Sequence, residues 1–482
     1  MAQHYCRGLR PCDIDRHDRE VSRTRFADTL DGVGDGVPAR RPERLHASAL
    51  ASVFTDRSAR GIADRLGDLI HSGELAQGLH LPTVRALAAA LHVGPTTIAT
   101  AWAQLRQRGL IHCDRRRGSF VRGPGMLAGR RFASLPPPPP VRLDLSTAYP
   151  DPALVPDLAG PMALAVAGTP WREYPDDMVD PHLAAALHAT WPFEAEDFTV
   201  TSGAHDAVHR VAGVVLRRHD RVLVEEVAAA SLLDIVEDHG AQAVPVRCDD
   251  EGPLPEALAA ALATRPGMLL LQTRMASPYG HALSRRRAES LTPMLAGHDI
   301  VIVEHDTAHE LAPTPHVSLG EFLPEQILLV RSWNKSHGPH LRVGALAGIR
   351  RVVSRVRARQ KATGGWPSAL TQRALAQMLT DPQTRETIRR ARAIYRHRRQ
   401  QMVHALREQG LTPTGVAGLS VWVPVRDAAT AIRSLAADGI GIAPGAPFTV
   451  HGDGRSHVRI ATTLRHDEHA RIARVLGEAH HR

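Results

Sequence analysis

The sequence contains almost no lysine. Of its 59 basic residues, 57 are arginine, and only Lys335 and Lys361 are lysine. An arginine excess of this size is typical of a genome-wide coding bias, so the abundance of arginine alone identifies no binding partner. Hydrophobic residues make up 43% of the chain and charged residues 23%, which is the composition of a globular protein with only local disorder.

Cysteine and long apolar segments are also scarce. The four cysteines, Cys6, Cys12, Cys113 and Cys248, are scattered, with no C-x-x-C motif and no histidine pair at the spacing of zinc ligands. We therefore expect free thiols in a reducing cytoplasm and no metal site. The chain has no N-terminal apolar signal segment and no run of about 18 apolar residues, so we expect neither secretion nor a membrane span.

The charge is concentrated at the front of the chain. Residues 1–141 carry 21 Arg against 13 Asp and Glu, a balance of +8, which leaves +1 of the total +9 for residues 142–482. Such asymmetry predicts that the front third faces a polyanion, either nucleic acid or an acidic membrane surface. A length of 482 residues favours two or three domains.

Changes in composition divide the chain into five segments. Residues 1–50 show no helical or strand period and are expected to be a mobile tail, and residues 51–123 turn helical and then briefly extended. Residues 124–141 contain Pro136 to Pro140, which predicts a polyproline-type linker. Residues 142–350 alternate short apolar runs with helical stretches, which is typical of a mostly parallel sheet covered on both faces. Residues 351–482 are expected to form a smaller α+β lobe.

Residues 81–107 have the pattern of a helix-turn-helix. Apolar residues at helical spacing follow Thr83, which is placed to cap the first helix. A short turn at His92 to Gly94 precedes Pro95, which suits the first position of a second helix because no N–H is needed there. Two helices joined by so short a turn are typical of DNA-binding modules.

The second of these helices presents short polar side chains outward. Ile98, Trp102 and Leu105 are expected to face the core, which leaves Thr96 and Thr100 outside and Thr97 at the flank. Hydroxyl groups and helix N-terminal amides suit phosphates and thymine methyl groups in a major groove. Two extended pieces follow, with Arg115, Arg116 and Arg117 at the turn between them, where guanidinium groups can neutralise phosphates. A small three-helix bundle whose threonines and arginines only face water is the alternative that this periodicity leaves open.

Lys335 is the residue of greatest chemical interest in the rest of the chain. It follows an apolar strand-like run, with Ser332 three residues before it and Arg342 seven after it. This grouping suits an aldehyde cofactor held by the lysine as an imine, with its phosphate bound by a hydroxyl and a guanidinium. A surface lysine in a loop is the alternative.

Residues 81–121 resemble the winged-helix domain of the GntR family of bacterial regulators. The matching segments are Leu81-Pro82-Thr83-Val84-Arg85, Thr97-Ile98, Ala101-Trp102, Gly109-Leu110-Ile111 and Gly118-Ser119-Phe120-Val121. The resemblance implies that double-stranded DNA is bound by Thr83, Arg85, Pro95, Thr96, Thr97, Thr100, Arg115, Arg116, Arg117 and Gly118. Gly94-Pro95 stands where the family commonly has Ser-Arg, so the operator sequence does not carry over.

Residues 142–482 resemble fold-type I aminotransferases, and the whole chain resembles the MocR-type regulators, which join such a domain to a GntR winged helix. The resemblance implies an α/β fold of the pyridoxal 5′-phosphate-dependent transferases, usually dimeric, with a smaller C-terminal lobe. The residues it assigns to the cofactor are Ser202, Gly203, Ala204, His205, His305, Thr307, Ser332, Lys335 and Arg342. Arg459 aligns with the arginine that receives a substrate carboxylate, although a rim arginine at a strand end has the same pattern.

Three departures from the aminotransferase pattern surround the cofactor ring. His305 stands where the family has the carboxylate that faces the pyridine nitrogen, unless a one-residue shift brings Asp306 there. In the same segment Thr307 replaces a tyrosine near the ring oxygen. The second departure is Ala229, which replaces the stacking tyrosine, and the third is Pro278-Tyr279-Gly280, which stands where the family has Pro-Thr-Gly. Transamination needs a protonated ring nitrogen, which a histidine does not stabilise as a carboxylate does.

These observations favour a cytoplasmic, DNA-binding transcriptional regulator whose aminotransferase-like domain senses an amino acid or amine, binds pyridoxal 5′-phosphate through Lys335, forms a homodimer and has no catalytic residues. One alternative is an active aminotransferase tethered to DNA. Another is a large domain that serves only as a dimerisation scaffold.

Overall fold

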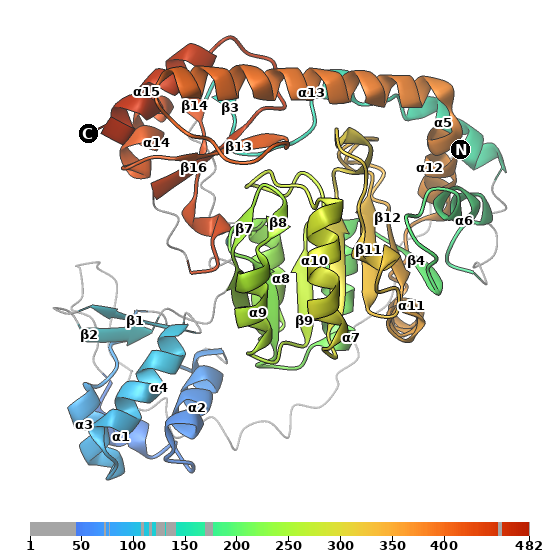
Figure 1. The fold of residues 1–482 in the computed structure, drawn as a ribbon. Coiled ribbons are helices and arrows are strands. Elements are labelled where there is room, and N and C mark those ends of the chain that lie inside the picture. The colour runs from blue at the N-terminus through green and yellow to red at the C-terminus, as the bar shows by residue number, and fades with distance from the viewer. Residues whose placement is uncertain are drawn as a thin grey trace, which may run out of the picture. The chain divides into compact units, whose positions relative to one another are not determined.

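The computed structural model describes residues 45–71, 74–76, 78–107, 110–114, 118–121, 131, 141–168, 177–451 and 456–481. The chain divides into two compact units, Met1–Met126 and Leu127–Arg482, which are described separately (Figure 1).

The first unit is a helix-turn-helix followed by a β-hairpin. Its elements in chain order are α1 (Ala47–Ala51), α2 (Ala59–His71), α3 (Val84–Leu91), α4 (Pro95–Gln107), β1 (Ile111–Asp114) and β2 (Gly118–Val121). The two strands pair antiparallel, with Ile111 opposite Val121. The predicted helix-turn-helix and the extended pair after it are therefore confirmed.

The ends and faces of α3 and α4 follow from the residues that the sequence pattern identified. The Thr83 hydroxyl accepts a hydrogen bond from the Ala86 N–H at 3.2 Å and so caps α3, as predicted. His92 takes a left-handed conformation that ends α3, and α4 starts at Pro95. Ile98, Trp102 and Leu105 of α4 are buried against the other helices, which confirms the predicted inward face.

Helix α1 corrects the predicted extent of the mobile tail. The sequence prediction placed residues 1–50 in that tail, but α1 occupies Ala47–Ala51, and Leu50 is buried in the core of the first unit. This helix has only five residues, which is too short to show a helical period, so sequence reasoning missed it. Residues 1–44 lie outside the part of the chain that the structure describes.

The second unit is built around a seven-stranded sheet in the order β4-β12-β11-β10-β9-β5-β6. These strands span Asp197–Thr201, Gly344–Gly348, Ile327–Ser332, Val301–Asp306, Met268–Leu271, Arg221–Glu225 and Gln242–Val246, in that order. All run parallel except β12, which pairs antiparallel with both neighbours. The predicted mostly parallel sheet is confirmed, and each of the apolar runs around residues 221, 268, 300 and 327 forms one of its strands.

Helices cover both faces of the sheet (Figure 1). One face packs on α7 (Ala204–Val215), α8 (Ala230–Asp238) and α11 (Arg350–Thr363), and the other on α9 (Pro255–Leu262) and α10 (Arg285–Ala296). A two-stranded ribbon, β7 (Cys248–Asp249) and β8 (Gly252–Pro253), precedes α9. At the β4 edge lie α5 (Ala159–Gly168), α6 (Pro181–His188) and α12 (Ala369–Thr380). Short 3₁₀ turns occur at Pro152–Leu154, His309–Leu311 and Leu319–Glu321.

A smaller lobe follows the long helix α13 (Pro382–Glu408). Its sheet has the order β13-β16-β15, formed by Ser420–Pro424, His457–Ala461 and Ala443–Pro444, and it packs with α14 (Ala428–Ala437) and α15 (His469–His481). The 3₁₀ turn η4 (Ala446–Phe448) lies between β15 and β16. Strand β3 (Leu143–Asp144) pairs with β14 (Ile440–Gly441), so the chain enters the second unit through this lobe.

The sequence prediction placed the boundary between the large domain and the small lobe at residue 350, but the hydrophobic cores of the two parts do not divide there. Helices α11 and α12 join the cores of the large domain, whereas Leu145, Ala148 and Leu154 belong to the core of the small lobe. The sequence shows where helices replace strands but not which core each helix covers. Among the helices that the structure describes, none is long and apolar enough to cross a bilayer.

The backbone of β12 leaves no room for a side chain at Gly348. Its φ is +139°, and a Cβ atom there lies 2.0 Å from the carbonyl oxygen of Ile327. We expect Gly348→Ala to lower the free energy of unfolding by about 2–4 kcal/mol, measured by urea denaturation, because the clash is with backbone. Gly297→Ala is the control, since no atom lies within 4 Å of a Cβ there. Equal stability of the two variants contradicts the strand pairing described here.

Candidate functional site

Lys335 lies just after β11, at the carboxyl end of the parallel strands. Its Nζ donates a hydrogen bond to the carbonyl oxygen of Ala148 at 3.1 Å. Burial, together with the nearby Arg459 cation, lowers the pKa of Lys335 to about 8. A larger fraction of the amine is therefore neutral and nucleophilic near neutral pH than in an ordinary lysine. The alternative of a surface lysine in a loop does not fit this environment.

Arg459 lies on β16 of the small lobe and is also buried, with 6% of its surface exposed. Its Nη1 donates to the carbonyl oxygen of Ser146 at 3.0 Å, and its guanidinium carbon lies 5.2 Å from the centre of the Phe448 ring. Burial lowers the pKa of Arg459 to about 10, so the guanidinium remains charged at neutral pH. Its burial does not fit a rim arginine, and its acceptor Ser146 lies two residues from Ala148, the acceptor of Lys335, so both cations contact one short segment.

Gly203 forms a cradle beside this lysine, at the N-terminus of α7. Its φ is +112°, and a Cβ atom there lies 2.9 Å from Asn334 Nδ2 and 3.6 Å from Arg342 Nη2. Across the sheet, Gly344 pairs with both Thr201 and Ser332, so the ends of β4, β12 and β11 meet here. The segment before α7 therefore lies close to the Ser332 hydroxyl, the Asn334 amide and the Arg342 guanidinium. A helix N-terminus surrounded by such groups suits a phosphate.

His305 and His205, two of the residues that the sequence assigned to the cofactor, lie against each other. His305 is 3% exposed, and its ring stacks on that of His205 with 5.6 Å between centroids and an interplanar angle of 12°. Neither ring nitrogen of His305 has a hydrogen-bond partner among the described residues. Burial, with His205 and Lys335 nearby, lowers the pKa of His305 to about 3, so the ring is neutral. His205 Nε2 lies 2.9 Å from the Ser231 hydroxyl, and loss of water contact and the Lys335 and Arg342 cations lower its pKa to about 4.

The Asp306 carboxylate binds residues other than Lys335 and the two stacked histidines. Its carboxylate forms an ion pair with Arg274, and it accepts a hydrogen bond from the His309 N–H at 2.9 Å. Burial alone raises the pKa of a carboxyl group, but the Arg274 guanidinium holds that of Asp306 well below its ordinary value. Successive side chains of a strand point to opposite faces, so His305 and Asp306 cannot both face Lys335. The one-residue shift that the sequence left open is therefore not observed.

Sequence reasoning missed two polar groups of this site. Asn334 contacts the Gly203 cradle, and its Oδ1 is buried without a hydrogen-bond partner in the described residues. Its position immediately before Lys335 was a usable signal. Ser231 reaches His205 from α8, and nothing in its sequence context indicates that contact. Ala204 is buried as the first residue of α7, and Thr307 follows β10 and is partly exposed.

The residues predicted to bind DNA lie on exposed parts of the first unit, as far as the structure describes them. Those fully exposed are Thr83, Arg85, Pro95, Thr96, Thr100 and Gly118, and Thr97 is half-buried. The Thr83 hydroxyl is used as a helix cap, and the Thr100 hydroxyl donates to the Thr96 carbonyl oxygen at 2.9 Å. Arg115, Arg116 and Arg117 lie outside the described residues. The described part of the chain contains no cluster of side chains that could hold a metal ion.

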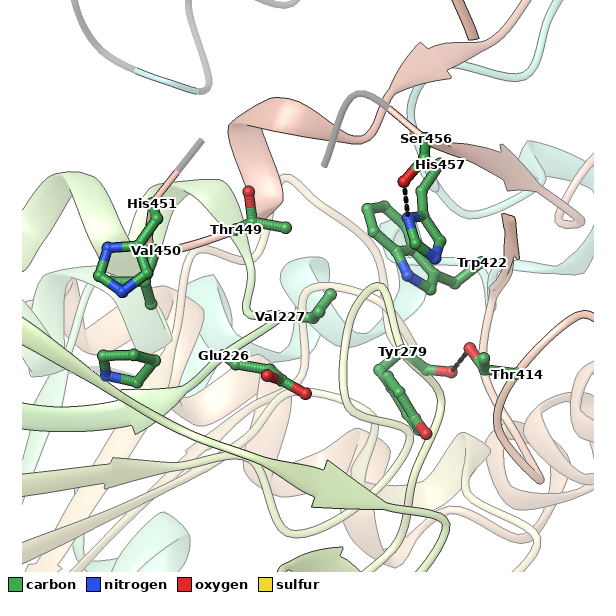
Figure 2. A pocket seen from close by; sticks show the side chains of 11 residues that line it. Glu226, Val227, Tyr279, Thr414, Trp422, Thr449, Val450, His451, Ser456 and His457 are labelled. Atoms are coloured by element: carbon green, nitrogen blue, oxygen red, sulfur yellow. Dashed lines mark hydrogen bonds between the residues drawn. The ribbon is translucent and has the colours of Figure 1, made fainter. Parts of the chain in front are cut away.

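A separate cavity of about 330 Å³ lies between the large domain and the small lobe (Figure 2). Large-domain residues Glu226, Val227 and Tyr279 line one side, and Trp422, Thr449 to His451, Ser456 and His457 of the small lobe line the other. The rings of Trp422 and His457 stack at 5.0 Å between centroids. Lys335 is not among the lining residues, so this cavity is distinct from the cofactor-like site.

Comparison with known proteins identifies both units. Residues 143–476 match the family model "Aminotransferase class I and II", and residues 58–121 match "Bacterial regulatory proteins, gntR family". The chain belongs to the MocR-type regulators of the GntR family. The MocR-type architecture predicted from the sequence is thereby confirmed.

Two curated relatives of this MocR-type chain are transcriptional regulators. The vitamin B6 salvage pathway transcriptional repressor PtsJ of Salmonella typhimurium is 32% identical, over 77% of this chain and 86% of PtsJ. The HTH-type pyridoxine biosynthesis transcriptional regulator PdxR of Corynebacterium glutamicum is 28% identical, over 70% of this chain and 76% of PdxR.

Among solved structures, LysN, an alpha-aminoadipate aminotransferase from Thermus thermophilus, is 25% identical with a TM-score of 0.66, and the match covers 74% of this chain and 96% of LysN. The fold-type I architecture is thus confirmed for the second unit.

The scarcity of lysine makes the role of Lys335 directly testable. We expect Lys335→Ala to abolish the visible absorption band that forms when pyridoxal 5′-phosphate joins a lysine amine, and Lys361→Ala to leave it unchanged. In the unmodified protein, the rate of band formation should rise with pH through about 8, because only the neutral amine reacts. A stopped-flow pH series measures this rate, and a band that survives in Lys335→Ala contradicts the assignment.

Proposed function

We propose that this MocR-type protein is a transcriptional regulator that binds operator DNA through its first unit and a small amine or amino acid through its second. The exposed face of α4 and the adjoining β-hairpin support the first part. The partly buried Lys335 and the buried Arg459 support the second, because one residue suits an aldehyde cofactor and the other suits a carboxylate. The regulatory names of PtsJ and PdxR agree with this proposal.

The residues present fit pyridoxal 5′-phosphate at the lysine and at the phosphate. Lys335 is placed to hold the aldehyde carbon, and the α7 N-terminus with Ser332, Asn334 and Arg342 is placed to hold the phosphate. When bound, this cofactor supplies an aldehyde that amines join and a ring that withdraws electrons. Arg459 can then orient the carboxylate of an amino acid toward Lys335.

The single observation that argues against transamination is the environment of His305. A neutral imidazole can donate one hydrogen bond to a pyridine nitrogen, but it does not hold a proton on that nitrogen as a carboxylate does. Asp306, the carboxylate that follows His305 in the sequence, is paired with Arg274 and points to the other face of β10. The site is therefore suited to binding amines and poorly suited to moving their protons and electrons.

A homodimer completes the proposal for DNA binding. Fold-type I domains commonly form dimers, and a dimer presents two winged helices to two half-sites of an operator. This arrangement predicts an operator with two related half-sites. An active aminotransferase tethered to DNA remains the competing proposal, and the turnover assay below decides between them.

Arg85 offers a direct test of DNA contact. We expect Arg85→Ala in the full chain to weaken binding to the upstream region of its own gene by about 3- to 10-fold and to reduce the slope of the salt dependence by about 1, because one phosphate contact is lost. Arg60→Ala is the charge-matched control, since Arg60 lies on α2 and pairs with Asp64 across one helical turn. Fluorescence anisotropy at several salt concentrations measures both. Equal losses in the two variants contradict a contact specific to Arg85.

The turnover assay tests the role of His305. We expect no measurable exchange of amino groups between an amino acid and a keto acid by the unmodified protein with pyridoxal 5′-phosphate. His305→Asp, which restores a carboxylate at this position, should accelerate the half-reaction with an amino acid by at least tenfold, followed by cofactor absorbance. His305→Asn, which is also uncharged, is the control. Turnover by the unmodified protein at about 1 s⁻¹ or faster, an ordinary enzyme rate, contradicts the proposal.

A further inference from the structure

The segment Ser146–Tyr149, here called the arch, supplies backbone acceptors to both cations of the candidate site. The Ser146 carbonyl oxygen accepts from Arg459 Nη1 at 3.0 Å, and the Ala148 carbonyl oxygen accepts from Lys335 Nζ at 3.1 Å. A backbone carbonyl is neutral, whereas a carboxylate carries a full charge and makes stronger hydrogen bonds to a guanidinium. The two cations are therefore held by acceptors that a ligand can replace.

Imine formation at Lys335 removes the hydrogen bond to Ala148. The neutral amine attacks the carbon of an aldehyde with its lone pair, the aldehyde oxygen leaves as water, and the nitrogen keeps at most one proton. The amine that donates to the Ala148 carbonyl oxygen in this structure is consumed in that step. An aldehyde and the arch thus compete for the same nitrogen.

Arg459 presents a similar competition to a carboxylate. Its Nε donates to the Ser420 hydroxyl at 3.4 Å, and its Nη1 donates to the Ser146 carbonyl oxygen. A carboxylate that binds a guanidinium through two nitrogens uses Nη2 together with either Nε or Nη1. In both geometries it meets a nitrogen that already has an acceptor.

The arch is fixed at both ends and faces water between them. Just before it, the Leu145 N–H donates to the Gly441 carbonyl oxygen at 2.7 Å. Just after it, the Asp151 N–H donates to the Tyr395 hydroxyl at 2.9 Å. Tyr149, on the arch itself, is 61% exposed. The middle of the arch can therefore move outward without opening the core on which its ends are fastened.

We propose that the arch competes with ligands for Lys335 and Arg459 and couples the two positions, so that a carboxylate on Arg459 makes Lys335 more accessible to an aldehyde. Each ligand removes one of the two hydrogen bonds that hold the arch, and the ligand that binds second has less to displace. Such coupling is reciprocal, since an aldehyde on Lys335 favours the carboxylate to the same extent. The inference rests on the proposed function for its biological meaning, but the arch itself is testable without cofactor or DNA.

Methylation of Lys335 in the full chain tests the arch. Formaldehyde with cyanoborohydride methylates neutral amines, and the only other lysine is Lys361, so mass spectrometry follows the two side chains separately. Ala148→Gly keeps the carbonyl oxygen, removes a buried methyl group and makes the backbone of the arch more flexible. We expect it to raise the methylation rate of Lys335 relative to Lys361 by about two- to fivefold.

Ala241→Gly is the matched control for this substitution. Ala241 lies between α8 and β6, outside regular structure, and it is 8% exposed, compared with 7% for Ala148. Its replacement should leave the ratio of the two methylation rates unchanged. Equal ratios in Ala148→Gly and the unmodified protein overturn the arch, and so does an equal rise in both variants.

Acetate tests the coupling between the two cations. At a pH above the Lys335 pKa of about 8, we expect acetate to raise the methylation rate of Lys335 severalfold, compared with chloride at equal ionic strength. In Arg459→Gln, which lacks the cation that acetate binds, acetate should have no effect. An unchanged rate in the unmodified protein, or an equal rise in Arg459→Gln, overturns the coupling. Failure of the proposed function has a different signature, no absorption band with pyridoxal 5′-phosphate while the methylation rates behave as expected.

Discussion

The site of the second unit depends on one short segment that binds two buried cations. The carbonyl oxygen of Ser146 accepts from Arg459 of the small lobe, and the carbonyl oxygen of Ala148 accepts from Lys335 of the large domain. Desolvation destabilises the charged form of both side chains and lowers their pKa values. The hydrogen bonds to backbone carbonyls offset part of this cost. The segment follows β3, whose pairing with β14 holds it in the small lobe. The lysine and the arginine lie close together because the segment that follows β3 accepts a hydrogen bond from each of them.

The electrostatics of the site favour binding over chemistry. Lys335 and Arg459 attract a carboxylate, and the cradle at Gly203 attracts a phosphate, so the cleft is arranged for anionic groups. The stacked pair of His305 and His205 adds no negative charge, because both rings are neutral at physiological pH. An aminotransferase uses a buried carboxylate to stabilise the protonated ring, whereas here His305 stands at that position and the adjacent Asp306 is paired with Arg274.

Local patterns predicted most of the fold, and long-range packing accounts for most of what they missed. The cap at Thr83, the start of α4 at Pro95 and the strands of the sheet depend on residues close in sequence, and each was predicted. The assignment of α11 and α12 to the large domain depends on contacts with residues far away in the chain, which periodicity does not encode. The hydrogen bonds that Arg131 donates to Asp234 and to the Val450 carbonyl oxygen are of the same kind, since both partners lie more than 100 residues away.

The candidate site was predicted where a rare residue or a family motif marked it. Lys335 stood out because lysine is scarce, and the Gly203 cradle because its motif is fixed in spacing. Whether His305 or Asp306 faces the ring depends on the register of β10, and a one-residue uncertainty reverses the answer. Ser231 carries no local signal at all. Three-dimensional contacts were therefore needed to choose between two adjacent residues with opposite consequences for the reaction.

The position of Leu50 bears on how the DNA-binding unit can be isolated. This leucine is 3% exposed and packs in the core with residues of α2, α3 and α4, and it lies before the boundary at residue 51 that composition indicates. A fragment that begins at residue 51 discards a side chain whose burial is worth about 1.5–3 kcal/mol, a substantial part of the stability of so small a module. A winged-helix fragment that keeps this stability therefore has to include α1 with Leu50.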